Sequence, residues 1–522
     1  MYNLITDPLV RTSGRDGCVY CFSLPELYVQ LASDTIASFP ALRPHQRHPW
    51  HALLCQLGAL ACLRSGLATP PADAEGWGTA LRALTPDVPN DEPWMLVTPP
   101  ERPAFLQAAA LGGLKGFRLL ATADALDVLV TANNHDVKSA RMLDGEPDDW
   151  LFALVALQTS EGYFGAHNYG VSRMNGGLAN RPGFSVAPAP PGGVGAHVMR
   201  DLCRLIAMRE DILEKHSIFA EDGLALVWLE PWDGASSLPA QELDPYYIEI
   251  CRRIRLVWRD GRLTAMAAGS KAARIAFGKE MNGLTGDPWT PIETKDGTAK
   301  ALTIDARGFS YERLSKILFE KGFEQAPLQK IGAGDPLDCS YLLICRALAR
   351  GKGKTEGLHE RRLIIPPRVA GIYRSGDLEP LAMTSQQRID QAGLVRKALR
   401  FGLMTLFQNG PKDFKQRDPS SEHRAAAFLD AFEADVDRDF FERLFSEIEA
   451  EGEAARREIR AAWLADLRER AFAILKNSET GSPSSTVRRY RAWVRAEGAF
   501  LGNFYKDFCD PYFPKDPSHV AA

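Results

Sequence analysis

LVRKALRFGLMTLF, residues 394–407, places apolar side chains at every third or fourth position. Residues with that spacing share one face of an α-helix, so the stretch predicts an amphipathic helix with a face to bury. The apolar positions are Val395, Leu399, Leu403 and Leu406.

Three further stripes of the same kind follow along the chain. Their members are Phe441, Leu444, Phe445 and Ile448, then Ile459, Trp463, Leu467, Ala471 and Ile474, then Val487, Tyr490, Val494, Leu501 and Tyr505. Helix breaks are expected near Gly410–Pro411, Gly452 and Gly481–Pro483. Four helices with short connections predict a C-terminal four-helix bundle over residues 381–522, preceded by a linker at 375–385, SGDLEPLAMTS.

Residues 1–380 have a different pattern. Short apolar segments such as CVYCFSL (18–24) and LALVWLEPW (224–232) are broken by Pro/Gly turns and alternate with helical patterns such as HALLCQLGALACLRSG (51–66). The sequence therefore predicts an α+β protein, with a large mixed α/β N-terminal domain followed by the bundle.

Composition is that of a globular chain. The 522 residues are 45% hydrophobic and 25% charged, enough for two to four domains. The N-terminal segment lacks a signal-peptide pattern, no apolar run is long enough to span a membrane, and nine cysteines fit a reducing compartment. We expect a cytoplasmic protein.

Net charge is −4, but positive charge is concentrated locally. Residues 346–374 hold eight Lys/Arg against two Glu, and residues 388–417 hold seven Lys/Arg against two Asp. Such stretches suit contact with a polyanion, or they form a solvated face.

Common catalytic signatures are missing, because the chain has no Walker A loop, GxSxG elbow or HExxH motif. Cys18 and Cys21 form a CxxC without a second pair, which favours core packing over zinc or redox chemistry. His45, His48 and His51 surround Pro49 and indicate a helix entry rather than a metal site. We predict no catalytic residue, metal or cofactor.

One candidate segment is NNHDVK, residues 133–138. It suits a polar turn, since Asn tolerates left-handed backbone. Its amides, imidazole and lysine also suit contact with nucleotides. A metal-dependent nuclease using His135, Asp136 and His167 is a third interpretation.

Two further segments are candidates. EGYFGAHNYGVSRMNGG, residues 161–177, is a glycine-rich loop that could enter a narrow groove, or whose glycines serve turn geometry alone. ALARGKGKTEGLHERR, residues 347–362, suggests either a β-hairpin with a basic tip or a mobile exposed loop.

With these features in this order, the chain resembles the CasA family, the large subunit of the type I-E CRISPR Cascade complex. The motifs that carry the resemblance are YNLITDPLVRT (2–12), NGLTGDPWTPIE (282–293), LHERRLIIP (358–366) and LVRKALRFGLMTLF (394–407). It extends collinearly over nearly the whole chain.

The resemblance implies a non-catalytic subunit that recognises the protospacer-adjacent motif (PAM) in double-stranded DNA and wedges the duplex open to start an R-loop. Implied partners are guide RNA, the other Cascade subunits, and an effector helicase–nuclease or nuclease-fused subunit.

Site residues carry over by position. The family's glycine loop falls on Gly165, Ala166, His167, Asn168, Tyr169 and Gly170, its lysine finger on Lys271, Arg274 or Lys279, and its wedge on Lys352, Lys354 and Thr355. Contact with guide RNA or a neighbouring subunit falls on Asn133, Asn134, His135 and Lys138. Contact with the displaced DNA strand is assigned to five basic residues of the bundle, Lys397, Arg400, Arg488, Arg489 and Arg495.

The chain departs from the family at several places. The family's run of glycines is interrupted here by Ala166, His167 and Asn168. Lys354 and Thr355 stand where amide residues are common in the family. Cys251 stands alone where many relatives have a cysteine cluster, so no zinc is expected. Rival interpretations are a stand-alone metal-dependent nuclease and a scaffold subunit that reads no sequence.

Overall fold

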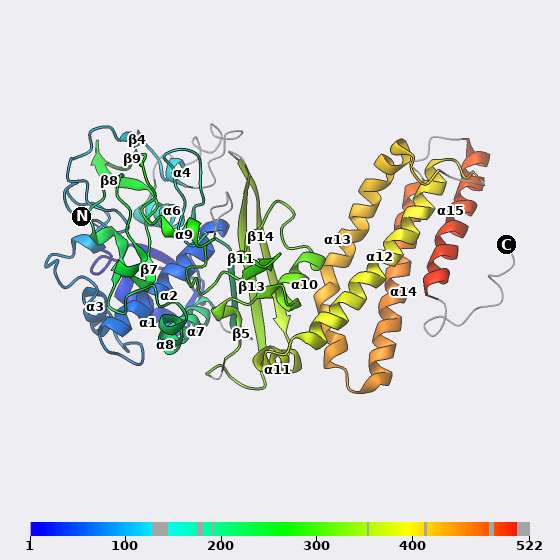
Figure 1. Ribbon diagram of the computed structural model, residues 1–522, viewed down its shortest axis with the longest axis horizontal. Helices are drawn as coiled ribbons and strands as arrows, with labels where there is room; N and C mark the ends of the chain where they lie inside the picture. Colours follow the sequence, from blue (N-terminus) through cyan, green and yellow to red (C-terminus); the bar gives the residue numbers. More distant parts are fainter. Residues whose placement is uncertain are drawn as a thin grey trace. The chain divides into compact units, whose positions relative to one another are not determined.

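The computed structural model describes residues 2–127, 145–174, 181–189, 193–332, 334–351, 354–411, 415–479 and 485–508. The chain forms two compact units (Figure 1). The first comprises Met1–Phe309 and Lys321–Ala370, and the second Ser310–Glu320 and Gly371–Ala522. The first mixes helices and strands and the second is helical, which confirms the predicted fold class. The main part of the helical unit thus begins at Gly371. The unit also includes Ser310–Glu320, a segment from within the predicted N-terminal domain.

The core of the first unit is built around α2 (Arg47–Arg64), against which α6 (Pro147–Ser160) and α7 (Val194–Ala207) pack. Every residue of α2 from His48 to Cys62 is buried, as expected for a helix that is largely apolar around its circumference. Pro49 lies in its first turn, where a missing N–H costs nothing, so the predicted helix entry is confirmed.

A long hairpin forms the sheet that is important for the site. Strand β13 (Ser340–Gly351) pairs antiparallel with β14 (Lys354–Ile365) and with β5 (Gly183–Ala189). Of the two predictions for residues 347–362, the hairpin is correct. Its turn, Lys352–Gly353, lies outside the described residues.

A second sheet, β4–β9–β8, lies beside the glycine-rich loop. Its strands are β4 (Arg118–Leu120), β8 (Arg253–Arg259) and β9 (Arg262–Ala268). The other strands are β1 (Val10–Gly14), β2 (Val19–Phe22), β3 (Ile36–Ser38), β6 (Leu224–Leu226), β7 (Leu243–Ile248), β10 (Ile292–Lys295), β11 (Thr298–Ala301) and β12 (Phe323–Glu324).

The CxxC prediction needs correction. Cys18 and Cys21 are exposed free thiols at strand β2, not core residues. Strand β2 is at an edge of the β2–β1–β3 sheet, and all its residues except Phe22 are exposed, so the apolar run does not face a core.

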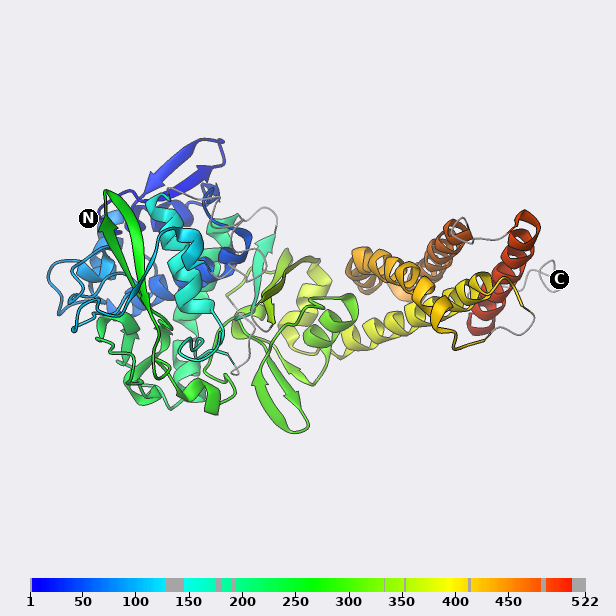
Figure 2. The same cartoon turned by 90° about the horizontal axis from the view of Figure 1, so that it is seen from above.

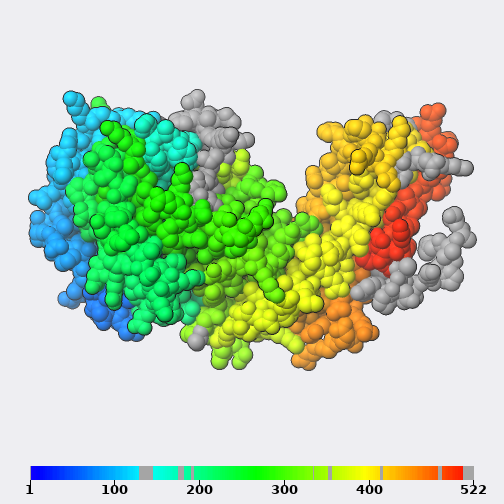
Figure 3. Space-filling view, viewed as in Figure 1, coloured from blue at the N-terminus to red at the C-terminus, as the bar shows by residue number. Residues whose placement is uncertain are grey.

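The described residues of the second unit form four long helices, which are coloured yellow to red in Figure 2. They are α12 (Glu379–Phe407), α13 (Pro419–Glu449), α14 (Gly452–Ser478) and α15 (Thr486–Asp507). All four apolar positions of the 394–407 stretch are buried. The space-filling view shows the red α15 against part of the yellow α12 (Figure 3). The expected linker is largely helical, because α12 already begins at Glu379.

The stripe predicted for the last helix is wrong. Val487, Tyr490 and Val494 are 81%, 69% and 48% exposed, and the buried residues of α15 are instead Ala492, Ala496, Phe500 and Phe504. Small alanines at the contact let α15 approach its neighbours closely, so the larger side chains are left on the outer face.

The shorter helices are α1 (Leu24–Ala32), α3 (Ala74–Arg82), α4 (Ala123–Leu126), α8 (Arg209–Lys215), α9 (Phe277–Glu280), α10 (Tyr311–Phe319) and α11 (Pro367–Ser375). Helix α10 joins the second unit through Tyr311, whose hydroxyl donates to Glu433 at 2.8 Å. Among the described helices, none combines the length and the apolar character needed to cross a membrane.

Candidate nucleic-acid interface

The glycine-rich loop directly follows α6 and closes on itself. The backbone N–H of Val171 donates to the carbonyl of Glu161 at 2.9 Å, which ties the two ends of the loop together. At its tip, the N–H of Asn168 donates to the carbonyl of Gly165 at 3.1 Å. Gly165 and His167 have φ values of +94° and +68°, so this tight turn uses left-handed backbone at two positions.

The loop is bound to the segment that carries Lys271. His167 Nδ1 donates to the carbonyl of Ser270 at 3.0 Å, and the Ser270 N–H donates back to the carbonyl of His167 at 3.0 Å. The Tyr169 hydroxyl donates to the carbonyl of Lys271 at 3.0 Å. One ring nitrogen of His167 therefore serves to hold the two segments together.

The three lysine-finger candidates lie in different environments. Lys271 is exposed beside the loop, and Lys279 is exposed on α9. Arg274 is only 3% exposed, its Nη2 donates to the carbonyl of Glu230 at 2.9 Å, and burial lowers its pKa. Because that guanidinium is enclosed by its own fold, the arrangement favours Lys271 over Arg274.

The turn end of the β13–β14 hairpin contacts the same loop. Arg350 pairs with Glu161 at 3.6 Å between side chains that are 4% and 3% exposed, and its guanidinium lies 5.0 Å from the ring centre of Phe164. Thr355 lies opposite Arg350 in the strand ladder. The described parts of three segments chosen from sequence are thus brought together: the glycine loop, the Lys271 segment and the hairpin.

Not every predicted residue can be placed. Asn133, Asn134, His135, Asp136 and Lys138 lie outside the described residues, as does Lys352.

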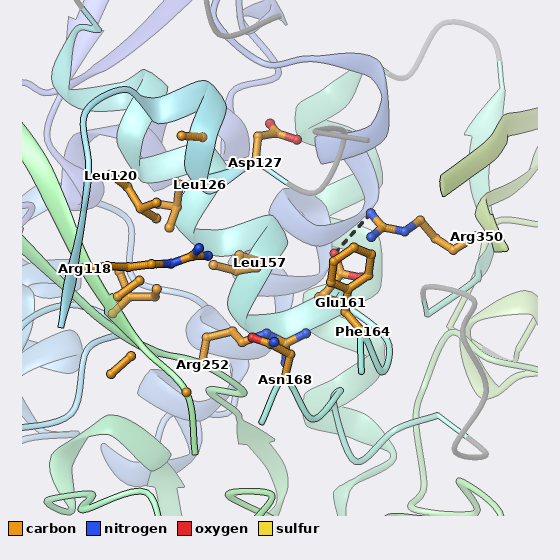
Figure 4. A pocket seen from close by; sticks show the side chains of 15 residues that line it. Arg118, Leu120, Leu126, Asp127, Leu157, Glu161, Phe164, Asn168, Arg252 and Arg350 are labelled. Carbon is orange, nitrogen blue, oxygen red and sulfur yellow. Dashed lines mark ion pairs between the residues drawn. The ribbon is translucent and has the colours of Figure 1, made fainter. Parts of the chain in front are cut away.

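A pocket of about 480 Å³ opens where these segments meet, and Figure 4 shows its lining. Arg118, Arg252 and Arg350 contribute positive charge, while Leu120, Leu126 and Leu157 belong to an apolar wall. Glu161 and Phe164 lie together at one side, where the dashed line marks the ion pair with Arg350. Sequence reasoning missed this pocket, because its residues are dispersed from Arg118 to Arg350 and form no local motif.

A histidine network lies elsewhere in the first unit. His51, Cys55 and Asp201 are buried and offer donor atoms within 4.8 Å of one another, a set that could hold a metal ion. Asp201 already accepts from His51 Nε2 at 2.8 Å, Arg200 Nη1 at 2.9 Å and Trp289 Nε1 at 3.3 Å.

Electrostatics in this network follow from those bonds. Burial raises the pKa of Asp201, but the neighbouring histidines and Arg200 outweigh it and hold that pKa well below its usual value. Burial chiefly lowers the pKa of His197 to about 4, so this ring is neutral at pH 7. Hydrogen bonds and the charge of Arg200 offset the cost of burying the Asp201 carboxylate. The network therefore explains these buried polar residues by a structural role.

The candidates on the helical unit are also unequal. Lys397 and Arg488 are exposed. Arg400 pairs with Glu422 at 2.8 Å, and Arg495 donates to the carbonyl of Gly410. Arg489 is half-buried. Lys397 and Arg488 are therefore the best placed of the five to meet a ligand.

A Gly170→Ala variant is expected to separate the two ends of the glycine loop, which the Val171–Glu161 hydrogen bond joins. A Cβ at this position would lie 2.5 Å from the carbonyl carbon of Gly162 and 2.6 Å from the nitrogen of Tyr163, both backbone atoms that cannot turn aside. Hydrogen–deuterium exchange should show the Val171 amide at least about tenfold less protected, in line with local opening. Gly112→Ala is the control, because a Cβ at Gly112 would have nothing within 4 Å. Equal protection of the Val171 amide in both variants would contradict the tight approach of Gly170 to residues 162–163.

Comparisons with known proteins agree with one another. The model of the family described as CRISPR-associated protein Cse1 matches residues 3–474. The crystal structure of Thermobifida fusca Cse1 is similar with a TM-score of 0.65 at 16% identity, covering 97% of this chain and 98% of that one. Cse1 from Acidimicrobium ferrooxidans gives 0.62 at 17% identity, covering 97% and 98%.

A Thermus thermophilus structure, described as CasA (Cse1), gives a TM-score of 0.62 at 14% identity and covers 97% of this chain and 99% of that one. A search of curated proteins finds no match. At these identities the structures show the shared fold, whereas the family model, which spans most of the sequence, decides membership. The chain belongs to the CRISPR-associated protein Cse1 family.

Proposed function

We propose that this protein is the non-catalytic large subunit of a type I-E CRISPR Cascade complex, and that it recognises the PAM in double-stranded DNA and starts R-loop formation. The observation that carries the proposal is the meeting of the glycine loop, the Lys271 segment and the β13–β14 hairpin in one unit. Family membership supports the assignment to a CRISPR complex.

Each segment has a role that suits its chemistry. The minor groove is only about 6 Å wide, so a glycine-rich backbone enters it more readily than bulky side chains do. Lys271 reaches the DNA from beside the loop as a phosphate or base-edge donor. The hairpin tip, with Lys354 and Thr355, inserts next to the motif and separates the first base pair, which costs a few kcal/mol.

His167 and Asn168 are the residues through which this chain sets its own motif preference. The His167 Nδ1 holds the loop against Ser270, and this leaves its other ring nitrogen and the half-buried Asn168 amide to meet a groove. The minor-groove edge distinguishes G·C from A·T mainly by the guanine amino group, for which Asn Oδ1 is a suitable acceptor.

The helical unit holds the displaced strand through phosphate contacts from Lys397 and Arg488, and the subunit helps to recruit the effector nuclease. Guide RNA carried by the other subunits reads the remaining target sequence by base pairing. In this division of labour the protein reads shape and a short motif only.

The test is a binding assay on the complex purified with the products of neighbouring genes, using a duplex library with a randomised motif. We expect a restricted set of motifs to bind, and Lys271→Ala to weaken that binding and to reduce the slope of log K against log salt by about 1. Lys295→Ala, an exposed lysine on β10 outside the proposed site, is the matched control. Equal binding of every motif would instead make the chain a scaffold subunit.

A further inference from the structure

The pocket beside the glycine loop contains a buried carboxylate that its surroundings do not satisfy. Glu161 is 3% exposed. Its Oε2 pairs with Arg350, whereas Oε1 has no hydrogen-bond partner among the described residues. A buried acceptor left without a hydrogen bond destabilises the fold, so an external donor at this position would be bound favourably.

The charges around Glu161 suit a ligand group that donates a hydrogen bond to it. Burial raises the pKa of this carboxyl above its ordinary value, because the opposing effect of Arg350 and Arg252 is smaller. Arg252 is itself occupied, since its Nη2 donates to the carbonyl of Gly162 at 3.1 Å. The two arginines offset part of the cost of burying a negative charge on Glu161, and neither forms a hydrogen bond to Oε1.

The rest of the lining distinguishes a flat, partly apolar ligand from a simple ion. Leu120, Leu126, Leu157 and Ile254 line the cavity, and Phe164, 44% exposed, stands beside Glu161 (Figure 4). Arg118 is exposed on β4 and its guanidinium extends across the pocket toward Leu157 (Figure 4). This lining matches a nucleotide. The base offers N–H groups to the acceptor and flat faces to the aromatic ring and the apolar wall, and the phosphate offers a negative charge to Arg118.

We propose that this pocket takes up one unpaired nucleotide of the DNA at the edge of the opened duplex, with its base against the apolar wall, a base N–H donating to Glu161 Oε1 and its phosphate meeting Arg118. The volume of about 480 Å³ falls in the range of sites for small organic ligands. The inference rests on the proposed function, because the glycine loop and the turn end of the hairpin, which contribute Glu161, Phe164 and Arg350, are the elements placed at the duplex. Capture of an extruded base recovers part of the unstacking energy and holds the junction open.

The test uses the full chain and fluorescein-labelled DNA duplexes that are blunt, or that carry one unpaired nucleotide at the end, or an abasic residue at that position. The unpaired guanine duplex should bind about 5- to 50-fold more tightly than the abasic one, as expected for stacking of one base. Ala125→Trp, which fills the pocket from a half-buried position, should abolish this difference and leave blunt-duplex affinity unchanged. Ala299→Trp on β11, half-buried and outside the pocket, should keep the difference.

Glu161→Gln tests the base contact separately from stacking. The parent chain should prefer an unpaired guanine over unsubstituted purine, which lacks the N–H donors of the guanine edge, by about tenfold, the effect of one charge-assisted hydrogen bond. The variant should lose this preference while still binding both probes more tightly than the abasic duplex.

The outcomes separate the pocket from the function on which it rests. Binding of blunt duplex without any gain from an unpaired base would overturn the pocket while leaving the proposed function intact. Failure to bind any duplex would count against the proposed function itself. Displacement of the unpaired-base duplex by guanosine monophosphate at equal concentration would show that the pocket takes free nucleotides, and would overturn the assignment to DNA.

Discussion

A Lys354→Ala, Thr355→Ala double variant is expected to form R-loops about 10- to 100-fold more slowly than the parent protein. The reason is that the proposed wedge offsets an unstacking cost of a few kcal/mol at the first base pair, and each 1.4 kcal/mol changes a rate about tenfold. The measurement is the rate of strand separation in the assembled complex, followed with a fluorophore and a quencher placed on the two DNA strands.

The chain offers a closely matched control for that experiment. Lys295 and Thr298 face each other across the turn of the β10–β11 hairpin, so Lys295→Ala, Thr298→Ala removes the same two side-chain types from another hairpin tip. We expect this control to open DNA at the parent rate. Both variants should assemble normally with guide RNA, and an unchanged R-loop rate in the first would remove the wedge assignment.

Asp287→Asn is expected to lower the free energy of unfolding of the first unit by about 3 to 5 kcal/mol, the usual cost of removing one partner of a buried ion pair. Asp287 and Arg181 form a bidentate pair between side chains that are 3% and 2% exposed. The same carboxylate accepts from the Thr290 hydroxyl at 3.0 Å, so its loss affects several bonds at once. Urea unfolding followed by tryptophan fluorescence measures the change.

The pH dependence of stability gives an independent check. Burial raises the pKa of Asp287, but Arg181 lowers it more, so the pKa in the folded protein lies below the ordinary value of an aspartate carboxyl. A depressed folded pKa contributes stability that is complete above the unfolded pKa and is lost as pH falls through the folded one. The Asn variant should therefore lose less stability than the parent when pH is lowered through that acid range.

Asp305→Asn is the control for this prediction. Asp305 pairs with Arg307 at 2.8 Å, but the two side chains are 48% and 81% exposed, so solvent screens the pair. No measurable change is expected. A comparable loss of stability in both variants would show that burial of the Arg181–Asp287 pair is not what stabilises the first unit.

Periodicity predicted much of the helical unit correctly. The apolar positions of α12 are all buried, namely Val395, Leu399, Leu403 and Leu406. A helix with one continuous apolar face removes it from water by packing that face against its neighbours. The same reasoning failed for α15. Its contact face contains alanines, whereas Val487 and Tyr490 point outward, and only the neighbouring helices decide which face fits.

Glycine and aromatic content also marked residues 161–177 as a special loop, and charge marked the hairpin. Neither signal revealed that His167 binds Ser270, or that Arg350 pairs with Glu161. Contacts of this kind join positions far apart in the chain, and no local pattern encodes them.

What the sequence by itself determined is therefore the order of elements, the helical character of the C-terminal part and the segments that carry unusual chemistry, since each depends on neighbours within a few residues. Only the tertiary structure decided that Lys271 rather than Arg274 is presented, because burial depends on residues such as Glu230 and Trp232 that pack around the guanidinium. It alone also produced the pocket at Glu161. A cavity and a buried carboxylate oxygen without a hydrogen bond are properties of packing between distant segments, which periodicity and composition do not record.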